Sequence, residues 1–290
     1  MFQGSMTALV TPFRDGKVDY EALSRIVEHQ IEHRTSALVP CGSTGESATM
    51  SHDEHIEVIT AVIKAARGRV PIIAGTGSNS TAESISLTKA AKNAGADAAL
   101  LISPYYNKPT QEGIFRHYAT IAAEARLPLI VYNIPGRTGS KIEAKTIARL
   151  AEIEEIIGLK ESTGSLDEVA EVYRLCGDKL EIYSGDDALT LPVIAVGGRG
   201  VISVAANVAP RLSADLAAAA LEGDFTRARD LHYRMLPLMR ALFLETNPIP
   251  VKAAMAMLGF CGEDLRLPLL PLSDGPRATL RDQLQKLALL

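Results

Sequence analysis

Residues 129–161 read LIVYNIPGRTGSKIEAKTIARLAEIEEIIGLKE and contain one complete strand–helix–strand unit. Two apolar runs, Leu129–Asn133 and Ile156–Glu161, flank an amphipathic segment at Ala144–Leu150. The runs are almost continuously apolar rather than alternating, which is typical of parallel strands that are covered on both faces. This stretch therefore predicts a parallel sheet whose strands are connected by helices.

The same unit recurs along the chain, with strand starts roughly 20 to 34 residues apart, which is the length of one strand and its helix. The other predicted strands are Thr7–Thr11, Ala37–Pro40, Pro71–Ala74, Ala98–Ser103, Leu180–Ser184 and Gly200–Val204. The other predicted helices between strands are Tyr20–His33, Asp53–Ala66, Ala82–Ala94, Glu112–Ala125, Leu166–Cys176 and Ala188–Val196. Eight such units favour an α/β fold of the TIM (β/α)8 barrel type over an open sheet, although periodicity alone does not separate the two.

The pattern changes after the eighth predicted strand. From about Leu212 it is helical only, with predicted helices at Ala214–Leu221, Phe225–Leu244, Val251–Leu258 and Pro276–Leu289. We expect one of these to be the eighth barrel helix and the rest to form an extension. The chain is thus predicted to divide into a barrel that carries the active site, residues 1–224, and a C-terminal helical extension, residues 225–290.

Composition narrows the class of protein. The chain has 290 residues, of which 47% are apolar and 22% charged, and this argues against disorder. A net charge of -4 without a basic block speaks against binding to nucleic acid. No apolar stretch reaches the roughly 18 residues of a membrane span, and the N-terminus lacks a signal sequence, so we expect a cytoplasmic protein. Three scattered cysteines, and a His52–His55 pair without a third ligand, predict neither disulfides nor a metal site.

A lysine closes one of the predicted strands. In a parallel barrel the active site forms at the C-terminal ends of the strands, and Lys160 follows the apolar residues Ile156–Leu159. Desolvation at such a place favours the neutral amine, which is the nucleophilic form. The alternative is a lysine whose stem covers apolar surface while its ammonium extends into water.

Two further strand ends carry polar groups. Tyr132, at the end of Leu129–Asn133, can pass a proton, and Arg137 on the following glycine-flanked loop can bind a carboxylate with two hydrogen bonds. The loop Gly42–Ser47 offers hydroxyl and backbone N–H groups suited to a carboxylate or phosphate. The alternatives are a core tyrosine, a surface arginine and an ordinary capped turn.

Taken together, these motifs resemble the dihydrodipicolinate synthase family, within the lysine-dependent pyruvate aldolase superfamily. The resemblance covers essentially the whole chain and is carried by Gly42–Ser47, Ala74–Gly77, Pro104–Pro109, Tyr132–Gly139, Gly158–Glu161 and Asn247–Lys252. It implies a lyase that condenses pyruvate with L-aspartate-4-semialdehyde through a lysine Schiff base, in lysine and diaminopimelate biosynthesis. It also implies that neither a metal nor an organic cofactor is needed.

The resemblance assigns roles to individual residues. Lys160 matches the residue that forms the imine with pyruvate. The proton relay matches Tyr132, Ser43 and Tyr106, of which Tyr106 reaches across a tight dimer interface. The substrate contacts match Thr44 for the pyruvate carboxylate, Arg137 for the aldehyde's carboxylate, and the backbone at Gly185 and Ile202.

The resemblance also implies regulation and assembly. In lysine-inhibited members the feedback site at the dimer interface matches Ser47, Ala48, His52, His55, Asn79, Glu83 and Tyr105. We therefore expect inhibition by L-lysine, and a homotetramer built as a dimer of dimers.

Two alternatives to this function remain. The relay position more often carries threonine in the synthases, whereas here it is Ser43, which also occurs in sibling N-acetylneuraminate lyases. A sibling pyruvate-dependent lyase or aldolase, acting on N-acetylneuraminate or a keto-deoxy sugar acid, is thus the first alternative, and Arg137 favours the synthase over it. A non-catalytic barrel that binds a small acid is the second.

Overall fold

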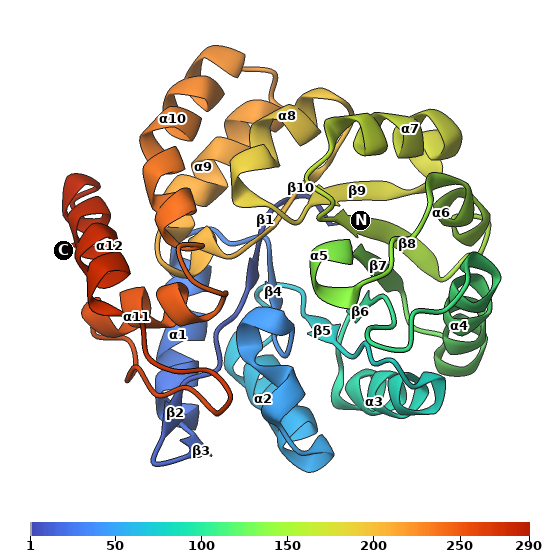
Figure 1. Cartoon of the computed structure of the whole chain (residues 1–290), viewed down its shortest axis with the longest axis horizontal. Helices are drawn as coiled ribbons and strands as arrows, with labels where there is room; N and C mark the ends of the chain where they lie inside the picture. Colours follow the sequence, from blue (N-terminus) through green and yellow to red (C-terminus); the bar gives the residue numbers. More distant parts are fainter. Residues whose placement is uncertain (1) are drawn as a thin grey trace.

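The computed structural model describes residues 2–290, in which eight parallel strands form a barrel surrounded by helices (Figure 1). The barrel strands are β1 (Gly4–Ala8), β4 (Ala37–Val39), β5 (Ile73–Gly75), β6 (Ala98–Ile102), β7 (Leu129–Asn133), β8 (Ile156–Glu161), β9 (Glu181–Ser184) and β10 (Gly200–Ser203). Their spatial order is β4-β1-β10-β9-β8-β7-β6-β5, and a parallel bridge between Leu38 and Ile72 joins the two edges. The predicted TIM barrel is confirmed.

Helices follow the strands and cover the outside of the barrel. They are α1 (Tyr20–Glu32), α2 (His52–Ala66), α3 (Thr81–Ala94), α4 (Gln111–Ala125), α6 (Ala144–Leu150), α7 (Leu166–Cys176), α8 (Thr190–Ala195) and α9 (Pro210–Leu221). Five of them begin with a side-chain cap, at Asp19, Ser51, Ser80, Thr110 and Ser165. Each cap accepts a hydrogen bond from a backbone N–H that the first helical turn leaves free, and this fixes where the helix begins.

The C-terminal helices α10 (Phe225–Ala241), α11 (Ile249–Met257) and α12 (Asp274–Lys286) lie together on one side of the barrel (Figure 1). Helix α10 packs on α9, and α12 packs on both α10 and α11. The sequence predicted all three helices, with ends that differ from the observed ones by at most three residues. Within residues 2–290, no helix is long and apolar enough to cross a membrane.

The first strand was predicted three residues too far along the chain. It covers Gly4–Ala8 rather than Thr7–Thr11, because Gly4–Thr7 pairs with Gly200–Ser203 of β10. The apolar residues Leu9 and Val10 are buried, but they follow the strand, and the Val10 N–H donates to the Asn207 side chain at 3.1 Å. The prediction was wrong because apolar, buried residues that follow the strand were taken to be part of it.

Several short elements follow no periodic pattern and were not predicted. They are the hairpin β2 (Phe13–Arg14) and β3 (Lys17–Val18), helix α5 (Pro135–Thr138), and the 3-10 turns η1 (Ser43–Gly45), η2 (Ser47–Thr49), η3 (Gly177–Lys179), η4 (Asp187–Leu189) and η5 (Ala205–Asn207). Among those that follow the C-terminal end of a strand, η1 after β4 and α5 after β7 contain the predicted site residues Ser43, Thr44 and Arg137.

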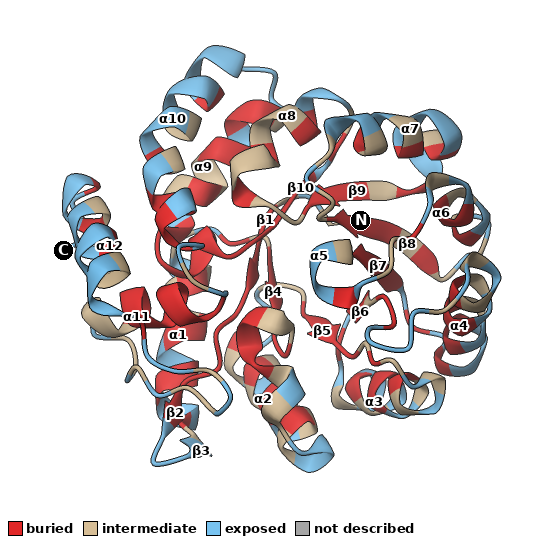
Figure 2. Ribbon diagram, in the orientation of Figure 1, coloured by how far each residue is buried: buried red, intermediate tan, exposed pale blue. Residues whose placement is uncertain are grey.

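Burial separates the barrel from its surface. The strands are almost entirely buried, whereas the outer helices alternate between buried and exposed faces (Figure 2). Inside the barrel, side chains such as Met6, Ile130, Tyr183 and Ile202 pack against each other. The barrel interior is therefore a packed core rather than a pore.

Candidate active site

Lys160 lies at the C-terminal end of β8, inside the barrel. Its neighbours across the sheet are Tyr132 on β7 and Tyr183 on β9. The residue is only 5% exposed, and its Nζ atom lies 4.3 Å from the centre of the Tyr132 ring. In the part of the chain from residue 2 to 290, no carboxylate forms an ion pair with this amine. The alternative of an ammonium that extends into bulk water is therefore wrong.

Gly185 makes room for the lysine side chain. A Cβ atom at this position would lie 1.8 Å from Ser162 Oγ, which would have to move, and 3.0 Å from Lys160 Cε, which is a tight contact. A side chain at residue 185 would therefore press on Ser162 and on the Lys160 stem. A glycine here thus defines the path of the Lys160 stem into the barrel.

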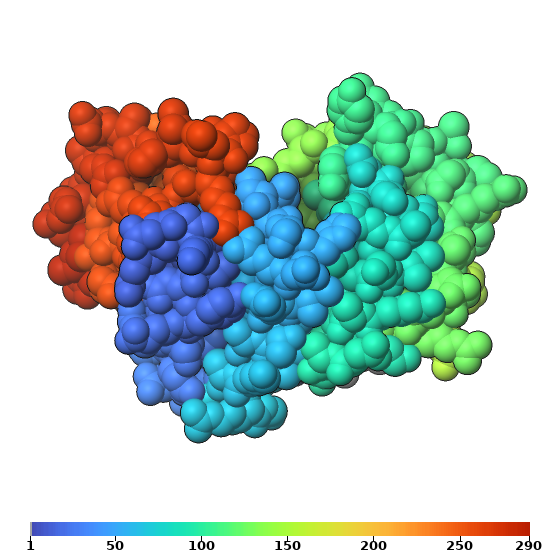
Figure 3. Space-filling view, turned by 90° about the horizontal axis from the view of Figure 1, so that it is seen from below, coloured from blue at the N-terminus to red at the C-terminus, as the bar shows by residue number. Residues whose placement is uncertain are grey.

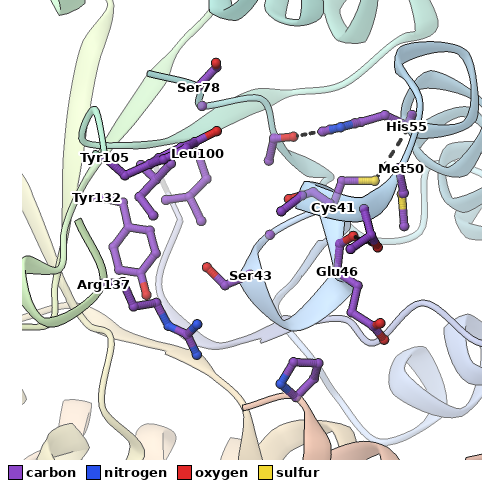
Figure 4. Close-up of a pocket in the computed structure, with 18 of the residues that line it drawn as sticks. Cys41, Ser43, Glu46, Met50, His55, Ser78, Leu100, Tyr105, Tyr132 and Arg137 are labelled. Carbon is purple, nitrogen blue, oxygen red and sulfur yellow. Dashed lines mark hydrogen bonds between the residues drawn. The ribbon is translucent and has the colours of Figure 1, made fainter. Parts of the chain in front are cut away.

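A cavity of about 180 Å³ lies above the amine. It brings together the predicted residues Lys160, Tyr132, Ser43, Thr44, Arg137 and Gly185. Figure 4 shows a larger adjoining cavity that shares three of these residues, and there the Tyr132 hydroxyl, the Ser43 hydroxyl and the Arg137 guanidinium face a common space. The smaller cavity therefore combines an amine, the hydroxyl groups of Tyr132, Ser43 and Thr44, and a cation around a volume suited to a small acid.

The hydroxyl groups come from a tightly turned loop after β4. Ser43 begins η1, and left-handed backbone occurs on both sides of this turn, at Cys41 two residues before it and at Glu46 directly after it, with φ of 57° and 56°. Thr44 is buried, and its Oγ1 accepts a hydrogen bond of 3.0 Å from Asn247 Nδ2. Two reversals of the backbone thus direct the loop into the barrel mouth.

Arg137 is held at the mouth by α5. Pro135 starts this short helix, and its fixed φ suits the first helical position. The Arg137 Nη2 donates to the backbone oxygen of Asn247 at 2.8 Å, which leaves the other guanidinium N–H groups available to a ligand. Arg137 thus borders the same cavity as the Lys160 amine.

Asn247 is a site residue that received no role from the sequence. Its side chain lines the cavity, its Nδ2 binds Thr44, and its Oδ1 is buried without a partner. It comes from the segment between α10 and α11, so the C-terminal extension contributes to the site. The motif Asn247–Lys252 was visible in the sequence, but its distance from the other motifs gave no hint of this contact.

Two predicted residues do not line this cavity in the described chain. Tyr106 is 89% exposed, with a left-handed φ of 71°. It lines neither this cavity nor the adjoining one in its own chain, so a relay role for it requires a second subunit. Ile202 packs into the barrel interior, and Val204, two residues further on, reaches the cavity instead.

A second cavity of about 440 Å³ adjoins the first and shares Ser43, Tyr132 and Arg137 with it. Six of the seven predicted regulatory residues line it: Ser47, Ala48, His52, His55, Glu83 and Tyr105. The seventh, Asn79, donates through Nδ2 to the backbone oxygen of Tyr105 at 3.1 Å. Figure 3 shows a hollow between the orange-to-red C-terminal extension and the teal-to-green part of the chain, with blue residues between them.

The wall of the second cavity contains an ionised carboxylate, Glu83, which can attract a cation. Hydrogen bonds from Ser78 and then His52 lower the pKa of Glu83, so this carboxylate is ionised at neutral pH. Burial lowers the pKa of His55, whose Nε2 lies 2.7 Å from the backbone oxygen of Gly75. Across residues 2–290, no group of three His, Cys, Asp or Glu side chains is arranged to hold a metal ion.

The model of the dihydrodipicolinate synthetase family matches residues 1–287. The chain belongs to this family. It is 55% identical over 280 residues to the 4-hydroxy-tetrahydrodipicolinate synthase of Pelobacter propionicus, a match that covers 97% of each protein. The resemblance noted in the strand-end motifs is confirmed.

Two solved structures of family members are informative. The chloride-inhibited dihydrodipicolinate synthase of Acinetobacter baumannii, in complex with pyruvate, is 46% identical and superposes with a TM-score of 0.99 over 100% of both chains. The enzyme (DHDPS) of Cyanidioschyzon merolae, with lysine bound, is 40% identical and has a TM-score of 0.97, covering 100% of this chain and 99% of that one.

Proposed function

We propose that the chain is a lyase that condenses pyruvate with L-aspartate-4-semialdehyde, the 4-hydroxy-tetrahydrodipicolinate synthase reaction of lysine and diaminopimelate biosynthesis. The observation that carries the proposal is the buried Lys160 amine, which has no carboxylate partner and lies against Tyr132 in a small cavity. The family relatives of that name support it, one of them solved with pyruvate. We further propose a cytoplasmic location, because the substrates are small water-soluble metabolites.

The residues suggest the order of steps. The neutral Lys160 amine attacks the ketone of pyruvate, and loss of water leaves a protonated imine. This imine withdraws electrons, so a methyl proton leaves and an enamine forms. The enamine carbon then bonds to the aldehyde carbon of the second substrate, whose oxygen takes up a proton. Tyr132 and Ser43 move these protons, and Thr44 with the loop N–H groups binds the pyruvate carboxylate.

Arg137 distinguishes the proposed reaction from those of the sibling lyases. A guanidinium at the cavity mouth suits a short aldehyde that carries a carboxylate, because it can form two parallel charged hydrogen bonds. A sugar acid such as N-acetylneuraminate presents hydroxyl groups there instead. The identity of the second substrate is thus inferred from Arg137, whereas pyruvate as the first substrate is inferred from Lys160.

We expect the wild-type protein to consume pyruvate and L-aspartate-4-semialdehyde in a coupled assay, and to leave N-acetylneuraminate unchanged. Arg137→Leu should raise KM for the aldehyde on the order of tenfold to a hundredfold, the effect of losing one bidentate charged contact. Its KM for pyruvate should change much less. Cleavage of N-acetylneuraminate by the wild type, without condensation, would instead identify a sibling lyase.

Tyr106 completes the relay in our proposal from a second copy of the chain. Its exposed ring stands on a loop with left-handed residues at Tyr106 and Lys108, which project it away from its own barrel. A tight dimer that brings this ring to the neighbouring cavity would explain why a large aromatic side chain is exposed in the single chain. Two such dimers form the proposed homotetramer. Sedimentation in solution measures the assembly directly.

L-Lysine is the proposed inhibitor, and the second cavity its binding site. Glu83 supplies an anion for an ammonium group, and Asn79 and the Tyr105 hydroxyl supply donors for a carboxylate. The lysine-bound family member supports the assignment. Ser47, Ala48, His52 and His55 form the remaining wall.

Millimolar L-lysine should lower the turnover of the wild type. Glu83→Gln should raise the half-inhibitory concentration about tenfold, because one charged contact contributes on the order of 1.4 kcal/mol or more. Glu152→Gln, which changes a surface carboxylate paired with Lys179, serves as the control and should keep wild-type inhibition. Equal lysine sensitivity of both variants would argue against this site.

A further inference from the structure

The active-site loop is tied to the C-terminal extension by a buried ion pair. Glu46, the residue directly after η1, contacts Lys252 on α11 through its Oε1. Lys252 is 0% exposed and Glu46 is buried as well. The second carboxylate oxygen of Glu46 accepts the backbone N–H of Arg266 at 3.1 Å. Both oxygens of one carboxylate are therefore bound by residues of the extension.

Glu46 does not face the reaction space. In Figure 4 its side chain points away from Tyr132 and the Ser43 hydroxyl, toward the side of the loop where the extension lies. Its own contribution to chemistry can only be made through the backbone that connects it to Ser43 and Thr44. Burial lowers the pKa of Lys252, and the adjoining Glu46 carboxylate opposes that effect.

The hydrogen bonds within the loop connect residues only three apart, from the Gly45 N–H on Gly42 O to the Met50 N–H on Ser47 O, so they shape single turns but do not fix the loop against the rest of the barrel. Neither η1 nor η2 has a side-chain cap, and both begin or end at Glu46 in its left-handed conformation. Such a conformation is unfavourable for a residue with a Cβ atom and persists where the surroundings hold it. The surroundings here are Asn247 on Thr44, Lys252 on Glu46, and the Arg266 Nη1 that donates to Thr49 O at 3.1 Å.

We propose that Glu46 and Lys252 are positioning residues, which hold the Ser43 and Thr44 hydroxyl groups in place for proton transfer and carboxylate binding. The inference rests on the proposed function, because it concerns the same hydroxyl groups. Stability alone does not require a charged pair here, since apolar residues of similar volume in place of a buried ion pair are often neutral or stabilising. An ion pair adds a directional contact on one particular carboxylate, and this fixes the backbone at residue 46.

The test is a double variant that removes both charges, Glu46→Gln with Lys252→Met. Because no unpaired charge is buried, we expect it to fold with a thermal midpoint close to that of the wild type. Borohydride trapping of pyruvate on Lys160 should persist. The rate of exchange of pyruvate methyl protons with deuterium oxide, and kcat for condensation, should fall together by on the order of tenfold to a hundredfold, as expected for a displacement approaching about 1 Å.

A matched control removes another carboxylate–cation pair of the extension, Glu263→Gln with Arg277→Met, which makes no contact with the loop. This control should keep wild-type exchange and kcat. A second double variant, Glu46→Asn with Lys252→Met, should likewise keep pyruvate trapping and lose exchange and kcat. Asparagine tolerates left-handed backbone, but its side chain is too short to replace that of glutamate.

The inference would be overturned if the Glu46→Gln/Lys252→Met protein exchanged pyruvate methyl protons, and condensed the two substrates, as fast as the wild type does. Equal losses of trapping, exchange and thermal midpoint would also overturn it, since they indicate a purely structural pair. Exchange requires pyruvate alone, so it tests the loop whatever the second substrate is. A wild type that neither traps pyruvate nor exchanges its protons would refute the proposed function as well, and this separates the two failures.

Discussion

Lys160→Met is expected to abolish condensation, with kcat/KM lower by a factor on the order of 10⁴ or more, as when a covalent nucleophile is removed. Methionine is close to lysine in volume and fills the space along Gly185, so the barrel should remain intact. The amine is the only part of the side chain that is lost. Activity in the coupled assay, and mass added by pyruvate with borohydride, measure the effect.

The control is Lys141→Met, which removes an amine near the same end of the barrel that is paired with Glu168 and 40% exposed. This variant should retain activity and should still be labelled at Lys160. A Lys160→Met protein with activity within tenfold of the wild type, or wild-type enzyme labelled at another lysine, would contradict the assignment.

Much of this site followed from strand ends alone. Tyr132 and Lys160 are far apart in the sequence, yet each closes an apolar run, and parallel strands in register bring such residues side by side. The same rule drew attention to the Gly42–Ser47 loop, whereas Gly185 was assigned only through the family resemblance. It worked because the length and polarity of the runs specify where a buried strand stops.

Contacts between residues that are far apart in the sequence could not be predicted from local sequence patterns. Thr44 and Asn247 are 203 residues apart, and Glu46 and Lys252 are 206 apart, so nothing in either stretch indicates its partner. The first strand shifted for a related reason: Leu9 and Val10 are buried by tertiary contacts, which hydrophobicity cannot distinguish from strand pairing. The role of Tyr106 depends on a second subunit and stays a prediction.

Lys252→Met is the second large effect, and it concerns stability. Removing one partner of a buried ion pair leaves an uncompensated charge, here the Glu46 carboxylate with a single backbone N–H remaining from Arg266. The free energy of unfolding should fall by about 3–5 kcal/mol. Urea denaturation of wild type and variant at the same protein concentration measures this change, with sedimentation to check that both have the same assembly state.

The same substitution at Lys160 should change the free energy of unfolding by no more than about 1 kcal/mol, because that amine has only the Tyr132 ring to lose. The two lysines are both buried, at 5% and 0% exposure, and only Lys252 has a buried carboxylate partner, so methionine should damage the fold at residue 252 and the reaction at residue 160. Adding Glu46→Gln to Lys252→Met should restore most of the lost stability while kcat stays low. If the single and double variants were equally unstable, the cost would come from packing around the Lys252 stem rather than from the buried charge.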